Sequence, residues 1–240
     1  MPNEIVSSLK VKIYSDGADK ASLLELAKSP FVSGFTTNPT LMRKAGINDY
    51  RAFAKDILAS IKDRPISFEV FADDFPNMAR QAREIASWGA NVYVKIPVTN
   101  SKGEPATALV HELAHAKIKL NVTAVFTLEQ VHAICQALKG GAPSVVSVFA
   151  GRIADTGCDP MPFMQHAVNA CNRAGGMEVI WASPRELLNI FQADEIGCHV
   201  ITVTPDIIKK LGGAGKDLGL FSLETVKLFY NDGAAAGFKL

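Results

Sequence analysis

The sequence predicts a single (β/α)8 TIM barrel, and three observations favour this fold. Eight short apolar runs bounded by turn residues recur at intervals of roughly 22 to 33 residues. Amphipathic helical stretches lie between these runs, which is the pattern of a parallel sheet with crossover helices. The length of 240 residues suits one barrel, and no low-complexity linker divides the chain. We therefore expect one domain over residues 1–240, with a short C-terminal helical tail.

The apolar runs define the expected strands in chain order. They lie near residues 11–15, 32–37, 66–71, 91–96, 118–123, 144–149, 177–182 and 199–203. Expected helices include residues 23–27, 78–88, 128–138 and 184–192. An open doubly wound sheet is the alternative, but it would usually carry a glycine-rich fingerprint after its first strand. The first strand here ends in Ser15–Asp19, which lacks that pattern and favours the closed barrel.

The tail, from about residue 222 to 240, carries a short amphipathic piece with Val226, Phe229 and Tyr230. We expect it either to pack on its own barrel or to reach a neighbouring subunit. The second possibility agrees with a homo-oligomer.

Composition restricts the classes of partner and compartment. The chain has 25 basic and 24 acidic side chains, and this balance argues against a nucleic-acid surface. Small molecules are therefore the expected partners. Residues 1–5 lack a signal pattern, and no run of 18 apolar residues is present, so we expect a cytoplasmic protein with no membrane partner. Four cysteines without CxxC spacing indicate reduced thiols: Cys135, Cys158, Cys171 and Cys198.

One lysine, Lys95, lies inside the run Val92–Val98, which otherwise has the composition of a buried strand. An ammonium group is rarely buried without a partner or a function. Because desolvation disfavours the charged form, a lysine in such surroundings becomes available as a neutral amine that can attack a carbonyl. A strand-end lysine whose ammonium reaches water is the alternative. The residues at the other strand ends favour the first interpretation.

Polar residues close most of the predicted strands. Since the active site of such barrels forms at the carboxyl ends of the strands, these side chains are expected to surround one pocket. Each alone could be a helix cap, a satisfied buried polar group or a surface charge. The residues are Asp16, Thr36–Thr40, Glu69, Lys95, Asn121, Thr123, Ser147, Phe149, Arg152, Ser183 and Arg185.

Five blocks at these strand ends resemble the transaldolases and their smaller relatives, the fructose 6-phosphate aldolase-like proteins. The blocks are Thr36-Thr37-Asn38-Pro39-Thr40, Val94-Lys95-Ile96-Pro97, Asn121-Val122-Thr123, Ser147-Val148-Phe149-Ala150-Gly151-Arg152-Ile153 and Ala182-Ser183-Pro184-Arg185. The likeness runs from the first strand to the eighth. It implies a class I aldolase-type barrel in carbohydrate metabolism, with the pentose phosphate pathway as the expected setting.

By this resemblance, Lys95 forms the Schiff base with the ketone of a ketose phosphate, and Asp16 acts as a general acid/base near the donor hydroxyls. Glu69 together with Thr123 would hold and activate a water molecule. The expected substrate-binding residues are Thr37, Asn38, Asn121, Ser147, Phe149, Arg152, Ser183 and Arg185. No cofactor and no metal are expected.

The reaction itself requires these residue types. Carbinolamine formation and dehydration move protons to and from the ketone oxygen, and a carboxylate such as Glu69 can relay them through water. Carbon–carbon cleavage requires a base for the hydroxyl proton, which suits Asp16. Arginine side chains match phosphate oxygens bidentately, and Arg152 and Arg185 follow adjacent strands. An apolar wall at Phe149 would keep water from the enamine.

Two positions separate transfer from simple cleavage. Family members that release free dihydroxyacetone resemble a pattern with glutamine at position 69 and tyrosine at position 149. Glu69 and Phe149 therefore favour transfer of a dihydroxyacetone unit from a ketose phosphate, such as fructose 6-phosphate or sedoheptulose 7-phosphate, to an aldose phosphate. Cleavage that releases dihydroxyacetone is the alternative. The segment Asp155–Pro160 and Pro184 depart from familiar transaldolases and leave the acceptor sugar open.

Three other hypotheses have weaker support. His111–His115 matches the HExxH pattern of zinc proteases, but both histidines fall opposite the apolar stripe of their helix, and the extended pattern with a third histidine is absent. Leu211–Asp217 resembles a phosphate loop with a misplaced first glycine and Asp217 where serine or threonine is required, so a mobile loop is favoured. A barrel that binds sugar phosphates without turnover would be expected to lack the complete lysine and acid set.

Overall fold

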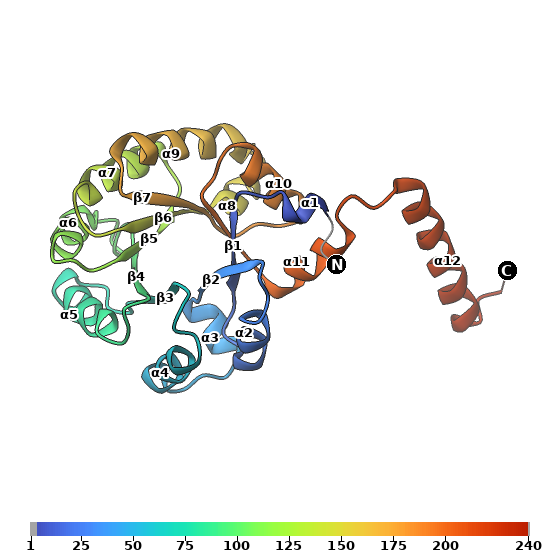
Figure 1. Cartoon of the computed structure of the whole chain (residues 1–240), viewed down its shortest axis with the longest axis horizontal. Helices are drawn as coiled ribbons and strands as arrows, with labels where there is room; N and C mark the ends of the chain where they lie inside the picture. The colour runs from blue at the N-terminus through green and yellow to red at the C-terminus, as the bar shows by residue number, and fades with distance from the viewer. Residues whose placement is uncertain (1–3, 240) are drawn as a thin grey trace.

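The computed structural model describes residues 4–239 and contains a closed barrel of eight parallel strands (Figure 1). Each strand pairs with its neighbours in sequence, and β1 also pairs with β8. The strands are β1 Lys12–Asp16, β2 Val32–Thr36, β3 Ile66–Glu69, β4 Val92–Pro97, β5 Leu120–Val125, β6 Ser144–Val148, β7 Met177–Trp181 and β8 Val200–Val203. The predicted fold class is confirmed.

Helices alternate with the strands, and most of them lie around the outside of the barrel (Figure 1). Their bounds are α1 Glu4–Ser7, α2 Lys20–Leu26, α3 Pro39–Lys44, α4 Tyr50–Ser60, α5 Phe75–Ala86, α6 Thr107–His115, α7 Leu128–Leu138, α8 Ala150–Ala154, α9 Pro160–Ala174, α10 Leu188–Glu195, α11 Pro205–Lys210 and α12 Leu218–Ala236. A short 3₁₀ turn, η1 Leu211–Gly213, follows α11 and occupies part of the predicted loop. Helix α10 begins later than the predicted helix over 184–192, because Ser183 has a left-handed φ of 61° and the chain stays irregular to residue 187.

Side-chain caps explain where several helices begin. Asp19, Asn38 and Asp49 each accept a hydrogen bond from a backbone N–H in the first turn of α2, α3 and α4. Thr127 and Gln130 form a reciprocal capping box at α7, which starts and ends at the residues that the sequence predicts. Because β1 and β2 are parallel neighbours, the caps that follow them lie at the same rim of the barrel.

Apolar side chains fill the layer between the sheet and the helices, and a second cluster fills the barrel interior. The interior cluster consists of Tyr14, Val145, Ile180, Ala182 and Val200. The Tyr14 ring lies against Gly34 on the next strand, where an added Cβ would come within 2.6 Å of the ring. This packing closes the barrel interior, so only its mouth is left for a ligand.

The C-terminal helix α12 leaves the barrel and projects away from it (Figure 1). None of its residues is buried, although Leu218, Phe221, Phe229 and Tyr230 are large and apolar or aromatic. The tail therefore does not pack on its own barrel, which was one of the two expected arrangements. Helix α12 begins at Leu218, so it starts four residues before the expected beginning of the tail at about residue 222. Across residues 4–239, no helix is long and apolar enough to span a membrane.

Candidate active site

A cavity of about 530 Å³ opens at the carboxyl ends of the strands. Ten of the twelve residues that the sequence predicts for the site contribute to its wall. They are Asp16, Asn38, Glu69, Lys95, Thr123, Ser147, Phe149, Arg152, Ser183 and Arg185. The other two, Thr37 and Asn121, are buried behind this wall and act on it through hydrogen bonds. The structure thus gathers residues from seven strands or the loops after them around one opening.

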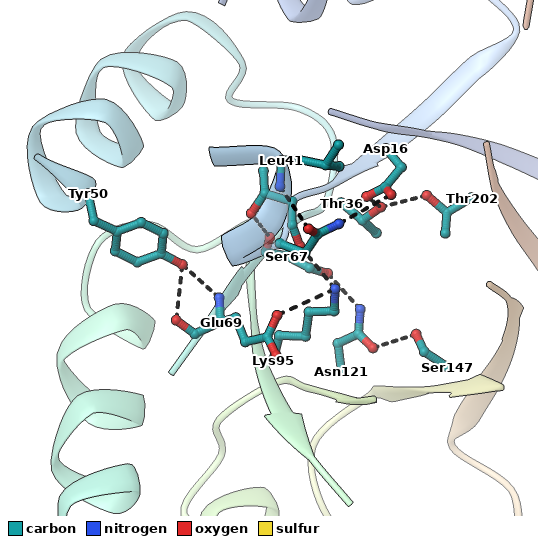
Figure 2. Close-up of polar contacts among 12 residues, drawn as sticks. Asp16, Thr36, Leu41, Tyr50, Ser67, Glu69, Lys95, Asn121, Ser147 and Thr202 are labelled. Atoms are coloured by element: carbon teal, nitrogen blue, oxygen red, sulfur yellow. Dashed lines mark hydrogen bonds and ion pairs between the residues drawn. The ribbon is translucent and has the colours of Figure 1, made fainter. Parts of the chain in front are cut away.

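Lys95 lies near the centre of this group, and only 7% of the residue is exposed (Figure 2). Its Nζ donates a hydrogen bond to the Thr37 carbonyl oxygen at 3.0 Å and lies 3.7 Å from Glu69 Oε2. The side chain comes from β4, where Lys95 pairs with Glu69 of β3 and Asn121 of β5. The amine therefore faces the cavity rather than bulk solvent.

Two carboxyl groups share the cavity with this amine. Burial raises the pKa of Glu69, although the neighbouring Lys95 opposes the shift and Asp16 adds to it. Burial also raises the pKa of Asp16, against the lowering effects of Lys95 and of a hydrogen bond from Thr36. Carboxyl groups with raised pKa values can hold and release protons nearer neutral pH than exposed ones do, which suits general acid/base chemistry.

A chain of hydroxyl groups holds Asp16 in place. Thr36 Oγ1 donates to Asp16 Oδ1 at 2.7 Å and lies 2.5 Å from Thr202 Oγ1 on β8 (Figure 2). Asn38 has two roles, because its Oδ1 caps α3 while its Nδ2 lies 3.4 Å from Asp16 Oδ2. Thr202 was not predicted as a site residue. The alternation of side chains along residues 200–203 was the signal that could have placed it inside the barrel.

A second chain of hydrogen bonds crosses β3, β5 and β6. Asn121 Nδ2 donates to Ser67 Oγ at 2.9 Å, and Ser147 Oγ donates to Asn121 Oδ1 at 2.6 Å. Both ends of the Asn121 amide are thus held, which explains why this residue supports the cavity without lining it. Thr123 differs, because the residue lines the cavity while its buried Oγ1 has no hydrogen-bond partner among the described residues. A water molecule or a substrate oxygen would satisfy it.

Cationic groups lie on the β6 and β7 side of the opening. Arg185 forms an ion pair with Asp155 through two nitrogens, and its Nη1 donates to Ser183 Oγ at 3.1 Å. The Arg152 guanidinium lies 5.4 Å from the centre of the Phe149 ring. Asp155, which belongs to the segment that departs from familiar transaldolases, therefore orients one of the two predicted arginines.

The arrangement on this side depends on Gly151. An added Cβ at this position would lie 1.5 Å from the Ser183 carbonyl oxygen, so no other residue fits without separating the loops after β6 and β7. Lys44, at the end of α3, also lines the cavity and was not predicted. The sequence could have indicated Lys44 only if Asn38 had been assigned as the cap of α3, because this helix brings the Lys44 side chain to the opening.

The HExxH segment lies elsewhere on the barrel surface. His111 and His115 are exposed, as predicted, and their rings stack with centroids 4.1 Å apart. Glu112, between them, forms an ion pair with Arg83. Within residues 4–239, no group of three or more histidine, cysteine or acidic side chains is placed to hold a metal ion.

Replacing Glu69 with glutamine is expected to reduce the pH dependence of the free energy of unfolding. Because burial raises the pKa of Glu69, the folded chain binds this proton more tightly than the unfolded chain does. Its contribution to stability is complete below about pH 4, near the pKa of an exposed glutamate, and is lost as the pH rises through the folded value. The original chain should therefore lose stability relative to Glu69→Gln as the pH rises above about 4.

Urea unfolding followed by circular dichroism at a series of pH values measures this difference, and the exposed Glu195→Gln is the control. A stability difference between the original chain and Glu69→Gln that stays constant with pH would contradict the prediction.

Comparisons with known proteins agree with the resemblance drawn from the strand-end blocks. The family described as Transaldolase/Fructose-6-phosphate aldolase matches residues 13–236. A "Probable transaldolase" of Dehalococcoides mccartyi is 36% identical over 202 residues, covering 84% of this chain and 90% of the relative. A "Probable transaldolase 2" of Listeria monocytogenes is 35% identical over 202 residues, covering 84% of this chain and 88% of the relative.

Among solved structures, 2,3-dimethylmalate lyase, a PEP mutase/isocitrate lyase superfamily member, superposes with a TM-score of 0.55 and 15% sequence identity. The match covers 99% of this chain and 96% of that chain, and it shows a shared fold only. The sequence relatives carry the assignment: this chain belongs to the transaldolase/fructose-6-phosphate aldolase family and is an enzyme of the transaldolase type.

Proposed function

We propose that this enzyme transfers a dihydroxyacetone unit from a ketose phosphate to an aldose phosphate through a Schiff base on Lys95. The observation that carries the proposal is the position of the Lys95 amine, which is buried at the mouth of a closed barrel and faces the same cavity as two carboxyl groups with raised pKa values. An amine and nearby acid/base groups are the elements that imine formation requires.

In the proposed reaction, the neutral amine of Lys95 attacks the ketone carbon of the donor and forms a carbinolamine. Loss of the hydroxyl group as water requires a proton, which Glu69 supplies through a water molecule held with Thr123. The distance of 3.7 Å between Lys95 Nζ and Glu69 Oε2 places the carboxyl group next to the reacting nitrogen. The unsatisfied Thr123 Oγ1 supports its assignment as a ligand for that water.

Asp16 is the proposed base for carbon–carbon bond cleavage. It takes the proton of the donor hydroxyl next to the bond that breaks, and the aldose phosphate leaves. The electron pair of the broken bond forms the carbon–carbon double bond of an enamine that stays attached to Lys95, and the iminium nitrogen regains its lone pair. Attack of that enamine on an acceptor aldehyde, with return of the proton from Asp16, and hydrolysis of the resulting imine complete the transfer. The hydrogen bonds from Thr36 and Asn38 hold Asp16 in one orientation during these steps.

Phosphate recognition is assigned to Arg152, Arg185 and Ser183. The fork of Arg185 is already oriented by Asp155, so it loses little conformational freedom when it binds an anion. Asn38 is assigned to the donor hydroxyl groups, while Thr37, Asn121 and Ser147 position the groups that touch substrate. The chemistry is carried by an amine, carboxyl groups and water, and we propose that no cofactor takes part.

Transfer is favoured over simple cleavage by Glu69 and Phe149. Phe149 lines the cavity, and Phe126 packs against it with ring centroids 5.6 Å apart, so an apolar surface faces the enamine. Water is less available there, which favours capture by an aldehyde over hydrolysis. The release of free dihydroxyacetone remains the alternative outcome of the same chemistry. A cytoplasmic role in carbohydrate metabolism, of the pentose phosphate type, agrees with four cysteines that form no disulfide.

We further propose a homo-oligomer in which a second copy of the chain covers α12. This helix exposes eight large apolar or aromatic side chains, far more than a solvated helix needs. Most of the stability of helices in proteins comes from packing against other elements, which α12 lacks within its own barrel. Packing against another subunit would remove that surface from water.

Borohydride reduction in the presence of fructose 6-phosphate is expected to attach a sugar-derived adduct to Lys95 alone. Peptide mass mapping identifies the modified residue, and Lys95→Met should carry no adduct. Lys44→Met serves as the matched control, because this lysine lines the same cavity and is expected to leave the Lys95 adduct in place. An adduct on any other residue, or none, would end the proposed mechanism.

Supplying fructose 6-phosphate together with erythrose 4-phosphate is expected to yield a seven-carbon ketose phosphate faster than free dihydroxyacetone. Mass spectrometry of the products measures both rates. The double variant Glu69→Gln, Phe149→Tyr should shift the ratio toward free dihydroxyacetone by about tenfold or more, because one barrier difference of about 1.4 kcal/mol is sufficient for that change. Faster release than transfer in the original enzyme would favour the aldolase assignment.

Charged substitutions on α12 are expected to reduce the mass of the assembly in solution. Phe221→Asp and Phe229→Asp place a carboxylate on surface that the proposed partner covers, whereas Lys227→Glu changes an exposed polar position. Sedimentation velocity measures the mass of each form. A monomeric original chain would rule out the oligomer. Equal effects of all three substitutions would show that the apolar surface of α12 does not form the subunit contact.

A further inference from the structure

Tyr50 lies outside the cavity but contacts the backbone of one of its acids. It is the first residue of α4, and the Asp49 side chain caps that helix. The Tyr50 hydroxyl accepts a hydrogen bond from the Glu69 N–H at 2.7 Å and donates one to the Glu69 carbonyl oxygen at 3.0 Å (Figure 2). One hydroxyl group thus satisfies both polar atoms of Glu69 on that edge of β3.

The position of these bonds matters because the ladder between β2 and β3 stops there. Phe35 N–H donates to the Pro65 carbonyl and Thr37 N–H donates to the Ser67 carbonyl, with an advance of two residues on each strand. In a regular parallel ladder, the next bond would run from the Glu69 N–H to the Thr37 carbonyl. That carbonyl instead accepts the hydrogen bond from Lys95 Nζ at 3.0 Å.

We propose that Tyr50 is a positioning residue that keeps the Thr37 carbonyl available to the Lys95 amine. By taking the Glu69 N–H, its hydroxyl removes the competing donor and holds the end of β3, from which the Glu69 side chain extends toward Lys95. This inference rests on the proposed Schiff-base function, because the orientation of the Lys95 amine affects turnover only if that amine reacts with the substrate. Tyr50 itself touches no reacting atom.

An aromatic cluster fixes the Tyr50 ring. Phe71, Trp88 and Phe68 surround it edge-on, with ring centroids 4.5, 5.8 and 6.0 Å away. Burial raises the pKa of Tyr50, so its hydroxyl keeps the proton that it donates to the Glu69 carbonyl. The ring thus holds a group that both donates and accepts at a point where β2 no longer pairs with β3.

Loss of this hydroxyl leaves the Glu69 N–H and carbonyl without their partner. The N–H is then expected to turn to the nearest acceptor in the ladder, the Thr37 carbonyl, and to compete there with Lys95 Nζ. The amine would lose a fixed acceptor, and Glu69 would move with the end of β3. Misplacement of a reacting group by about 1 Å is enough to reduce turnover by about a hundredfold.

The test compares Tyr50→Phe with two controls in the transfer assay. Tyr50→Phe keeps the ring and removes the hydroxyl, and it is expected to lower kcat by about 10- to 100-fold while the KM for fructose 6-phosphate changes by less than about twofold. Trp88→Phe weakens the cluster but keeps the hydroxyl, so it should lower the Tm without this loss. Tyr93→Phe removes another partly buried hydroxyl, two residues before Lys95.

A second readout does not depend on the sugar reaction. Reductive methylation of Lys95 with formaldehyde and cyanoborohydride, followed by peptide mass mapping over a range of pH, reports the reactivity of the amine directly. Tyr50→Phe should change this pH profile, and both controls should leave it unchanged. If the original chain forms no sugar adduct, the proposed function fails, yet this measurement still decides the role of Tyr50.

Substitution of Tyr50 by 4-aminophenylalanine provides the rescue, because the lone pair of its para amino nitrogen can again accept from the Glu69 N–H and its hydrogens can donate to the Glu69 carbonyl. Recovery of at least part of the lost kcat, with a methylation profile closer to that of the original chain, supports the inference. If Tyr50→Phe folds poorly, the 4-aminophenylalanine variant is compared directly with the original chain. Turnover and methylation in Tyr50→Phe that match those of Tyr93→Phe would overturn it. Equal losses in Tyr50→Phe and Trp88→Phe would do so too, because they would show a purely structural role.

Discussion

The hydrogen bond from Lys95 Nζ to the Thr37 carbonyl is the contact on which the site depends. It holds a buried amine at the mouth of a barrel whose interior contains a packed apolar cluster. A backbone carbonyl can serve this purpose only where a strand ends and its ladder partner is absent. The departure of β2 into the cap of α3 at Asn38 provides that ending. The end of β2 therefore both starts α3 and provides the carbonyl group that holds the Lys95 amine.

The two carboxyl groups next to this amine oppose the stability of the fold. Burial raises the pKa of both Asp16 and Glu69, so at neutral pH each is held in surroundings that disfavour its charged form. The positive charge of Lys95 offsets part of this effect for both groups. Such tension is common at functional sites, where groups are kept for their chemistry rather than for packing. Thr36 and Asn38 add hydrogen bonds that keep Asp16 in one orientation despite its unfavourable burial.

Much of the barrel could be predicted because strand and helix periodicities alternate clearly, and all eight strands were located within two residues of their ends. The site residues followed from the rule that polar side chains gather where parallel strands end. Several contributors escaped that reasoning, among them Thr202, Lys44 and Tyr50. Thr202 lies within β8 rather than after it, Lys44 reaches the cavity from α3, and Tyr50 contacts the backbone of Glu69 from α4. Tertiary packing places them, and periodicity along the chain cannot.

The packing partner of the C-terminal helix also could not be predicted from the sequence. Its pattern could not decide between the chain's own barrel and a neighbour, because apolar residues occur around most of α12 and no single face is marked. The barrel needs no further cover from it, since the interior and the layer beneath the helices are already filled. A segment with so much apolar surface is stable in water only if something else buries it. The candidate active site, built inside one closed barrel, is thus separate from the proposed association surface, which lies on a helix that the barrel does not use.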